Sequence, residues 1–251
     1  MNWALDLDGV LWRGNSPVPG SAGAVAALRE RGHRVVFVTN NSYQPVEVYV
    51  AKLRDMGVGA GPDEVVTSGQ AAASLLEPGT TALVCAGPGV DEALAQHGVT
   101  AVREGAADAV VVGWHGGFDY ERLTAAMTAV LGGARLVGTN DDATYPTETG
   151  LIPGGGSLLA AVAYASSATP EVAGKPNPAM VALIEGRVGH VDVMVGDRPN
   201  TDGLLARSLG ARFGLVLSGV TTDHDLPVEP EPDLVAPDLA AIVAAWAPPP
   251  S

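Results

Sequence analysis

The chain has 251 residues, which is enough for one large domain or two smaller ones. Hydrophobic residues make up 47% of it but aromatic residues only 5%, so the core must consist mainly of Ala, Val and Leu, as in parallel strands covered by helices. A formal net charge of -14 argues against a nucleic acid or an anionic membrane surface as the partner.

The sequence also bears on where the protein works. Its apolar runs are shorter than the roughly 18–20 residues that a bilayer-spanning helix needs. Acidic residues at positions 6 and 8 do not fit a secretory signal. Cys85 is the only cysteine, so no intrachain disulfide can form, and its apolar surroundings indicate a core position. We therefore expect a cytoplasmic protein.

Strand-like and helix-like runs alternate along the first part of the chain. An apolar strand over residues 3–7 ends in an acidic turn. The runs that follow predict a helix over 22–31, a strand over 34–38, a helix over 46–56, a strand over 65–68 and a helix to about residue 76.

After Pro78-Gly79 a second series of the same kind begins. It predicts strands over 82–85, 109–112 and 135–137, with helices over 90–97, 120–131 and 156–166. The first style then returns, with a helix over 178–186, a strand over 192–195, a helix over 201–209, a strand over 213–217, a helix over 239–246 and a frayed tail over 247–251.

Repeated strand–helix units predict an α/β fold whose parallel sheet has right-handed crossovers. We expect a discontinuous core of residues 1–78 and 170–251, with an inserted α/β domain over 79–169. Ligands bind at the carboxyl edge of such sheets, and a cleft between the two domains would lie over that edge.

Four motifs stand at predicted strand ends or helix starts. They are Asp6-Leu7-Asp8-Gly9, Thr39-Asn40-Asn41-Ser42, Gly174-Lys175-Pro176-Asn177-Pro178 and Gly196-Asp197-Arg198-Pro199-Asn200-Thr201-Asp202. Two acids at the exit of a buried strand cost stability unless a cation or a shared proton offsets their charge. Each motif alone is a modest signal, but the ordered set favours metal-assisted chemistry.

This ordered set resembles the haloacid dehalogenase (HAD) superfamily of phosphatases. The long insert, with Thr139-Asn140-Asp141-Asp142 and Pro153-Gly154-Gly155-Gly156-Ser157 near its end, resembles the class IIA cap of the NagD-like, 4-nitrophenylphosphatase-like branch. The resemblance covers nearly the whole chain. It implies a Rossmann-like parallel-sheet core with an inserted α/β cap, and a Mg²⁺-dependent phosphomonoesterase that works through an aspartyl-phosphate.

The resemblance also implies roles for the acidic residues. We expect Asp6 to be the nucleophile, and Asp8 to protonate the leaving alcohol and then activate water. The Asp6 carboxylate, the Asp8 backbone carbonyl and Asp197 would bind Mg²⁺, while Asp202 would support the metal-bound waters or ligate directly. Three alternatives remain: Asp8 as a turn residue, Asp202 as a helix cap and Arg198 as a surface ion-pair residue.

The phosphate would be held by the Thr39 hydroxyl, the Asn40 backbone N–H and the Lys175 ammonium group. Cap positions that could contact the substrate are Asn140, Asp142, His115 and the segment from Tyr145 to Thr149. His115 stands where the branch commonly has Asp. It could face the cleft or the solvent, and solvent is the favoured interpretation.

No residue type selects one substrate among glycerol phosphate, UMP or another nucleoside monophosphate, pyridoxal phosphate, a sugar phosphate and phosphoglycolate. A mutase-type enzyme that transfers phosphate to another sugar position, or a non-catalytic metabolite-binding protein, stays an alternative. Dehalogenation fits less well, because that branch lacks a second Asp and Asp8 is present. A homodimer formed through the cap is a further expectation.

Overall fold

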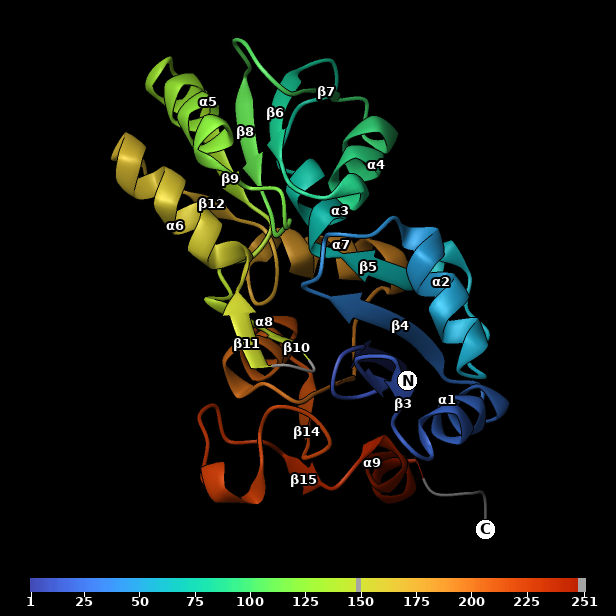
Figure 1. Ribbon diagram of the computed structural model, residues 1–251. Helices are drawn as coiled ribbons and strands as arrows, with labels where there is room; N and C mark the ends of the chain where they lie inside the picture. Colours follow the sequence, from blue (N-terminus) through green and yellow to red (C-terminus); the bar gives the residue numbers. More distant parts are fainter. Residues whose placement is uncertain (148–149, 248–251) are drawn as a thin grey trace. The chain divides into compact units, whose positions relative to one another are not determined.

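The computed structural model describes residues 1–147 and 150–247 (Figure 1). The chain forms two compact units, each built from several segments. Unit 1 comprises Met1–Thr39, Tyr49–Val66 and Val181–Ser251, and unit 2 comprises Asn40–Val48 and Thr67–Met180. Each unit is a set of residues that lie close together in space, which is not the same as a domain defined along the chain. The predicted domain boundaries at residues 78/79 and 169/170 therefore stay a prediction.

Unit 1 contains a six-stranded sheet with the order β15-β14-β13-β1-β4-β5. Its strands are β1 (Asn2–Asp6), β4 (Arg34–Thr39), β5 (Val65–Thr67), β13 (Val193–Gly196), β14 (Arg212–Val216) and β15 (Leu234–Ala236). β1 lies between β4 and β13 and is parallel to both, and β14 pairs in parallel with β13 and with β15. The predicted α/β class is therefore confirmed.

Helices cover this sheet because its strands are apolar on both faces. In β1 the residues from Trp3 to Leu5 are fully buried, as are Val36 to Val38 in β4. The helices are α1 (Ser21–Glu30), α8 (Leu204–Leu209) and α9 (Leu239–Trp246), together with most of α2 (Val46–Asp55) and α7 (Pro178–Val188). α1 and α9 lie side by side (Figure 1).

Unit 2 contains a five-stranded parallel sheet with the order β12-β9-β8-β6-β7. The strands are β6 (Thr81–Cys85), β7 (Thr100–Val102), β8 (Ala109–Val112), β9 (Arg135–Gly138) and β12 (Glu171–Val172). The helices are α3 (Ser68–Ala73), α4 (Pro88–Gln96), α5 (Tyr120–Leu131) and α6 (Gly155–Ser166). Figure 1 shows α5 and α6 on one side of this sheet and α3 and α4 on the other.

The alternation of side chains along β6 and β8 divides the core of unit 2 between the two faces. Leu83 and Cys85 are two residues apart in β6, and Val110 and Val112 are two residues apart in β8. All four belong to one buried cluster with side chains of α5 and α6. Burial raises the pKa of the Cys85 thiol to about 11, so the thiol is protonated at neutral pH. The predicted core position of Cys85 is confirmed.

The sequence pattern missed several of the shortest strands, although it predicted the three-residue strand β5. β7, β12 and β15 have two or three residues each and lie at sheet edges, too short for a clear apolar run. Also unpredicted are the hairpins β2 (Trp12–Arg13) with β3 (Ser16–Pro17), and β10 (Thr144–Thr147) with β11 (Gly150–Pro153). Prolines argue against strands in sheet interiors but are tolerated in such isolated ribbons.

Three predictions need comment. The helix predicted over 201–209 is wrong in its first part, because Pro199–Gly203 form a π-helix (η2) and α8 begins only at Leu204. Residues 248–251 of the predicted frayed tail, and residues 148 and 149 of the predicted cap segment, lie outside the described residues. No helix in the described ranges has the length and apolar surface that a bilayer crossing requires.

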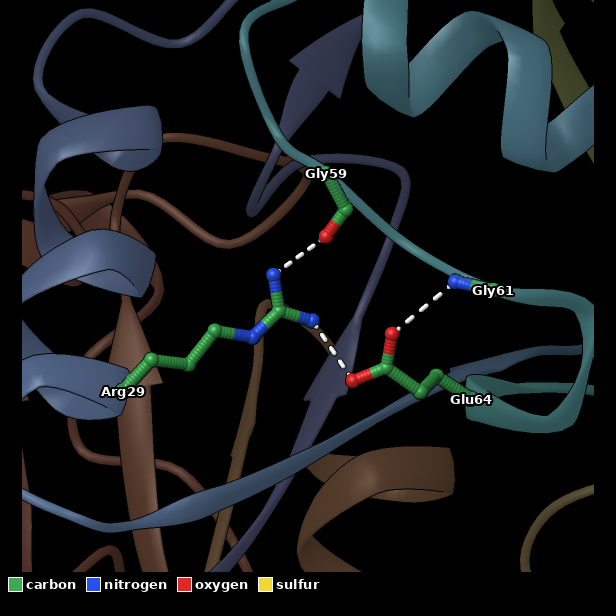
Figure 2. Close-up of polar contacts among 4 residues, drawn as sticks. All are labelled: Arg29, Gly59, Gly61 and Glu64. Carbon is green, nitrogen blue, oxygen red and sulfur yellow. Dashed lines mark hydrogen bonds and ion pairs between the residues drawn. The ribbon is translucent and has the colours of Figure 1, made fainter.

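In unit 1 an ion pair connects α1 to the loop before β5 (Figure 2). Arg29 donates from Nη2 to Glu64 Oε1 at 2.7 Å and from Nη1 to the Gly59 carbonyl. The other oxygen of Glu64 accepts from the Gly61 N–H at 2.9 Å, which caps the short 3-10 helix Pro62–Glu64 (η1). Glu64 therefore makes two separable interactions: an ion pair with Arg29 and a capping hydrogen bond with the Gly61 N–H.

We expect Glu64→Gln to lower the free energy of unfolding by less than about 1 kcal/mol, because a half-exposed ion pair contributes little and the amide oxygen still accepts from Gly61. Glu64→Ala removes the cap as well and should cost about 1 kcal/mol more. Urea unfolding measures both, with Glu30→Gln, an exposed change on α1, as the control. A loss of about 3 kcal/mol in Glu64→Gln would contradict this division.

Candidate active site

Three polar residues stand at the carboxyl ends of neighbouring strands of unit 1. Asp6 is the last residue of β1, Thr39 is the last residue of β4, and Asp197 directly follows β13. The parallel registers of β1 with β4 and with β13 bring these ends to one edge of the sheet. This edge is where open α/β sheets bind ligands, as the sequence predicted.

Asp6, Asp197 and Asp202 form a cluster in which one carboxylate oxygen of each residue lies within 4.8 Å of the others. All three side chains are buried, and Asp202 is 0% exposed. Three buried anions this close repel one another strongly unless hydrogen bonds or a cation offset their charge. The donor set consists of oxygen atoms only, which fits a hard divalent cation such as Mg²⁺.

Asp202 owes its position to the π-helix η2. Its Oδ2 accepts hydrogen bonds from the backbone N–H groups of Asp197, at 3.1 Å, and Arg198, at 3.0 Å. Gly196 makes room for it, because a Cβ at this position would lie 2.2 Å from the same oxygen. Asp202 thus orients the loop that carries Asp197, and its carboxylate is also close enough for the direct ligation considered from the sequence.

The loop after β14 holds Asp197, and the sequence analysis missed it. The Val220 N–H donates to Asp197 Oδ2 at 2.6 Å, and the Thr221 hydroxyl donates to the Asp197 carbonyl at 2.6 Å. A Cβ on Gly219 would lie 1.9 Å from Asp197 Oδ2, and one on Gly9 would lie 2.4 Å from it. The signal was present, because Ser218-Gly219 is another polar strand exit of the kind already recognised.

The Asp8 side chain is not in the carboxylate cluster. β1 ends at Asp6, and the chain turns sharply between Asp6 and Trp12. Gly9, within this turn, has a φ of 83°. The Asp8 Oδ1 accepts a hydrogen bond of 2.9 Å from the Trp12 indole Nε1–H. Asp6 and Asp8, the two acids of the first motif, therefore have different surroundings.

In unit 2 the Asn40 side chain joins two of the predicted motifs. Its Oδ1 accepts from the Lys175 backbone N–H at 2.7 Å, and its Nδ2 donates to the Lys175 carbonyl at 3.2 Å. Gly174 permits this approach, because a Cβ there would lie 2.6 Å from Asn40 Oδ1. Lys175 is 2% exposed, so the Asn40 amide holds the backbone of a buried residue.

Two of the predicted cap residues extend this network. Asn140 donates from Nδ2 to the Asn40 carbonyl at 2.8 Å, and its Oδ1 accepts from the Asp142 N–H at 3.2 Å. The Asp142 carboxylate accepts from Asn40 Nδ2 at 3.3 Å. Asn140 and Asp142 thus orient Asn40, and their predicted contact with substrate stays a prediction.

Three aromatic side chains lie next to this network: Tyr145, which begins the predicted cap segment, and Tyr43 and Trp114, which were not predicted as site residues. The Trp114 ring packs edge-on against Tyr43, with centroids 5.0 Å apart, and is stacked with Tyr145 at 6.0 Å. Asn41 Nδ2 lies 3.5 Å from the Tyr145 hydroxyl oxygen, at the limit of a hydrogen bond. These half-buried rings and the amides beside them combine apolar and polar surface, as small-molecule sites commonly do.

The favoured interpretation of His115 as solvent-facing is wrong. Its side chain is 9% exposed and packs edge-on against Phe118, with ring centroids 5.9 Å apart. Burial lowers the pKa of His115, and the nearby Arg122 lowers it further. The physical reason is that the loop directly after the fully buried strand β8 turns back so that Phe118 packs against the His115 ring.

The glycines around Asp197 yield a test. We expect Gly219→Ala to displace the Asp197 carboxylate and to lower Mg²⁺-dependent activity about 100-fold, because a shift of about 1 Å at a catalytic group costs that much. Gly186→Ala, where a Cβ meets open space within α7, is the matched control and should be neutral or stabilising. Mg²⁺ titration by calorimetry checks the cause, and an unchanged affinity in Gly219→Ala would contradict it.

Comparison with known proteins gives concordant matches over both units. Residues 3–100 match the model of a haloacid dehalogenase-like hydrolase family, and residues 172–242 match a second HAD hydrolase-like model. The acid sugar phosphatase of Staphylococcus saprophyticus is 34% identical over 230 residues, which is 89% of each chain.

Solved structures agree. The p-nitrophenyl phosphatase of Archaeoglobus fulgidus superposes with a TM-score of 0.91 at 30% identity, covering 97% of this chain and 98% of the other. The glycerol phosphate phosphatase of Mycobacterium tuberculosis, in complex with magnesium, superposes with a TM-score of 0.89 at 35% identity, covering 96% of this chain and 75% of the other.

Proposed function

This chain belongs to the haloacid dehalogenase-like hydrolases, in the class IIA branch of NagD-like and p-nitrophenyl phosphatases, and is a phosphatase; we propose that it hydrolyses small phosphate monoesters with Mg²⁺ through a phosphorylated Asp6. The family resemblance predicted from the four motifs is thereby confirmed. The observation that carries the proposal is the buried cluster of Asp6, Asp197 and Asp202.

A carboxylate is a poor nucleophile towards an anionic phosphate ester, because like charges repel. Bound Mg²⁺ neutralises charge on the phosphate oxygens and on the carboxylates that hold it. We assign its binding to the carboxylates of Asp6 and Asp197 and to the Asp8 carbonyl, with Asp202 as a support or a further ligand. The related glycerol phosphate phosphatase, whose structure is in complex with magnesium, supports the choice of Mg²⁺ as the cation.

Asp6 then attacks phosphorus in line with the leaving alcohol, forming an Asp6–phosphate bond as the phosphorus–oxygen ester bond breaks. Asp8 gives a proton to the leaving oxygen and afterwards takes one from the water that attacks the phosphorylated Asp6. The separate surroundings of the two side chains support this division of roles, because only Asp6 belongs to the carboxylate cluster.

We assign phosphate binding to the Thr39 hydroxyl, the Asn40 backbone N–H and Lys175. The burial of Lys175 supports its role, since a point charge in a site that excludes water acts on nearby anions with little screening. The double hydrogen bond between Asn40 and the Lys175 backbone would keep these two phosphate-binding groups in a constant relation.

The substrate class proposed here is small phosphate esters such as sugar phosphates, glycerol phosphate and aryl phosphates. It rests on the names of the relatives, namely acid sugar phosphatase, glycerol phosphate phosphatase and p-nitrophenyl phosphatase. Measurement of free phosphate with each ester separates hydrolysis from a mutase-type transfer, which releases none.

We expect Asp6→Asn to abolish turnover of 4-nitrophenyl phosphate while the melting temperature stays the same or rises, because one of three clustered charges is removed. The control is Asp55→Asn, an exposed change at the end of α2. Release of 4-nitrophenolate measures the rate. Normal turnover by Asp6→Asn would sink the proposed nucleophile.

Metal removal is the second test. Dialysis against EDTA should reduce phosphatase activity to background, and added Mg²⁺ should restore it and raise the melting temperature, because a ligand that binds the folded state stabilises it. Full activity in EDTA, or no thermal shift with Mg²⁺, speaks against a metal held by this cluster.

A further inference from the structure

We propose that Trp12 is a positioning residue for the proton-transfer step, and that its indole N–H holds the Asp8 carboxylate in the orientation from which it protonates the leaving group. This inference rests on the proposed role of Asp8 and deepens it. It concerns residues of unit 1 only.

The turn that carries Asp8 is closed by Trp12 through both backbone and side chain. Trp12 is paired with Asp8 in a β-bridge, and its carbonyl accepts from the Gly9 N–H at 2.7 Å. Its indole Nε1–H donates to Asp8 Oδ1 at 2.9 Å. Backbone pairing thus sets where the turn lies, and the indole sets how the carboxylate is rotated.

The indole itself has little freedom to move. Trp12 is 1% exposed and belongs to the β2–β3 hairpin, where it pairs with Pro17. The Lys52 ammonium lies 4.1 Å from the ring centroid and donates to the Gly14 carbonyl at 2.8 Å. The Trp12 ring thus contacts the Lys52 cation through its face and the Asp8 carboxylate through its N–H.

The consequence is chemical as well as structural. A general acid must place its proton within hydrogen-bond reach of the leaving oxygen, and catalytic groups tolerate deviations of only about 0.5 Å and 10–20°. The indole occupies Oδ1, which leaves Oδ2 as the oxygen that we assign to proton transfer. Without the indole, the carboxylate can rotate about its χ angles and loses this orientation.

The basicity of the leaving group isolates this role. 4-Nitrophenolate is a weak base and leaves without a proton, whereas phenolate is a stronger base and needs one. Phenyl phosphate and 4-nitrophenyl phosphate have nearly the same shape, so a change in binding affects both alike. Their kcat/KM values report the step in which the leaving group departs, before water attacks the phosphorylated Asp6.

The experiment compares Trp12→Phe with Trp3→Phe. Phe keeps most of the ring volume, which matters because Trp12 lines a cavity of about 210 Å³ that truncation to Ala would enlarge. Trp3 is the matched control: it is 0% exposed, lies in β1, and its Nε1 has no hydrogen-bond partner among the described residues. Both variants therefore lose a buried indole, but only one loses a bond to Asp8.

We expect Trp12→Phe to lower kcat/KM for phenyl phosphate about 10- to 100-fold and that for 4-nitrophenyl phosphate less than about 3-fold, in proportion to a lost hydrogen bond to a charged group. Trp3→Phe should change both values by the same factor. Equal losses for the two substrates in Trp12→Phe, or the same ratio of losses in the two variants, would overturn the inference.

Two further measurements keep the outcome interpretable. Asp8→Asn must show the same selective loss; if it does not, the proposed role of Asp8 fails, independently of Trp12. Should Trp12→Phe not fold, hydrogen exchange of the Trp12 indole N–H decides: it should be faster in Asp8→Ala than in the unchanged protein. An unchanged exchange rate would show that the hydrogen bond between the Trp12 indole and Asp8 does not restrain either side chain, which would overturn the inference.

Discussion

The mutual repulsion of three buried carboxylates is the constraint around which the carboxyl edge of the sheet in unit 1 is built. Asp6, Asp197 and Asp202 lie within 4.8 Å of one another, in surroundings where water screens little. Backbone N–H groups of residues 197, 198 and 220 donate to two of them. These hydrogen bonds offset part of the charge, and the Mg²⁺ that we propose would offset the remainder.

This constraint explains features that otherwise look unrelated. Gly9, Gly196 and Gly219 are needed because any Cβ there would meet an Asp197 or Asp202 side-chain atom. The π-helix replaces a regular helical start where Asp202 turns back to the N–H groups of residues 197 and 198. In unit 2 the Asn40 amide performs the corresponding task for Lys175, as it pairs with both backbone groups of that lysine.

Much of the fold and of the candidate site could be predicted because the relevant signals are local. Long apolar runs set β1, β4 and β8, and α5 and α9 begin and end where the sequence predicts, each with an Asp cap. The edge strands β7, β12 and β15 were missed, whereas the equally short edge strand β5, which begins with two valines, was predicted. Trp114 and Tyr43 were missed for another reason. They and the predicted Tyr145 are distant in sequence, and no local pattern indicates that their rings meet.

The sequence by itself determined the class of fold, the family and the acidic residues of the site, because strand periodicity and four ordered motifs are properties of short segments. Tertiary structure alone decided how those residues differ. It separated Asp8 from the cluster by ending β1 at Asp6 and bonding Asp8 to Trp12. It also buried His115 and placed Gly219 against Asp197. Such choices depend on contacts between segments that lie far apart in the chain, and periodicity within one segment carries no information about them.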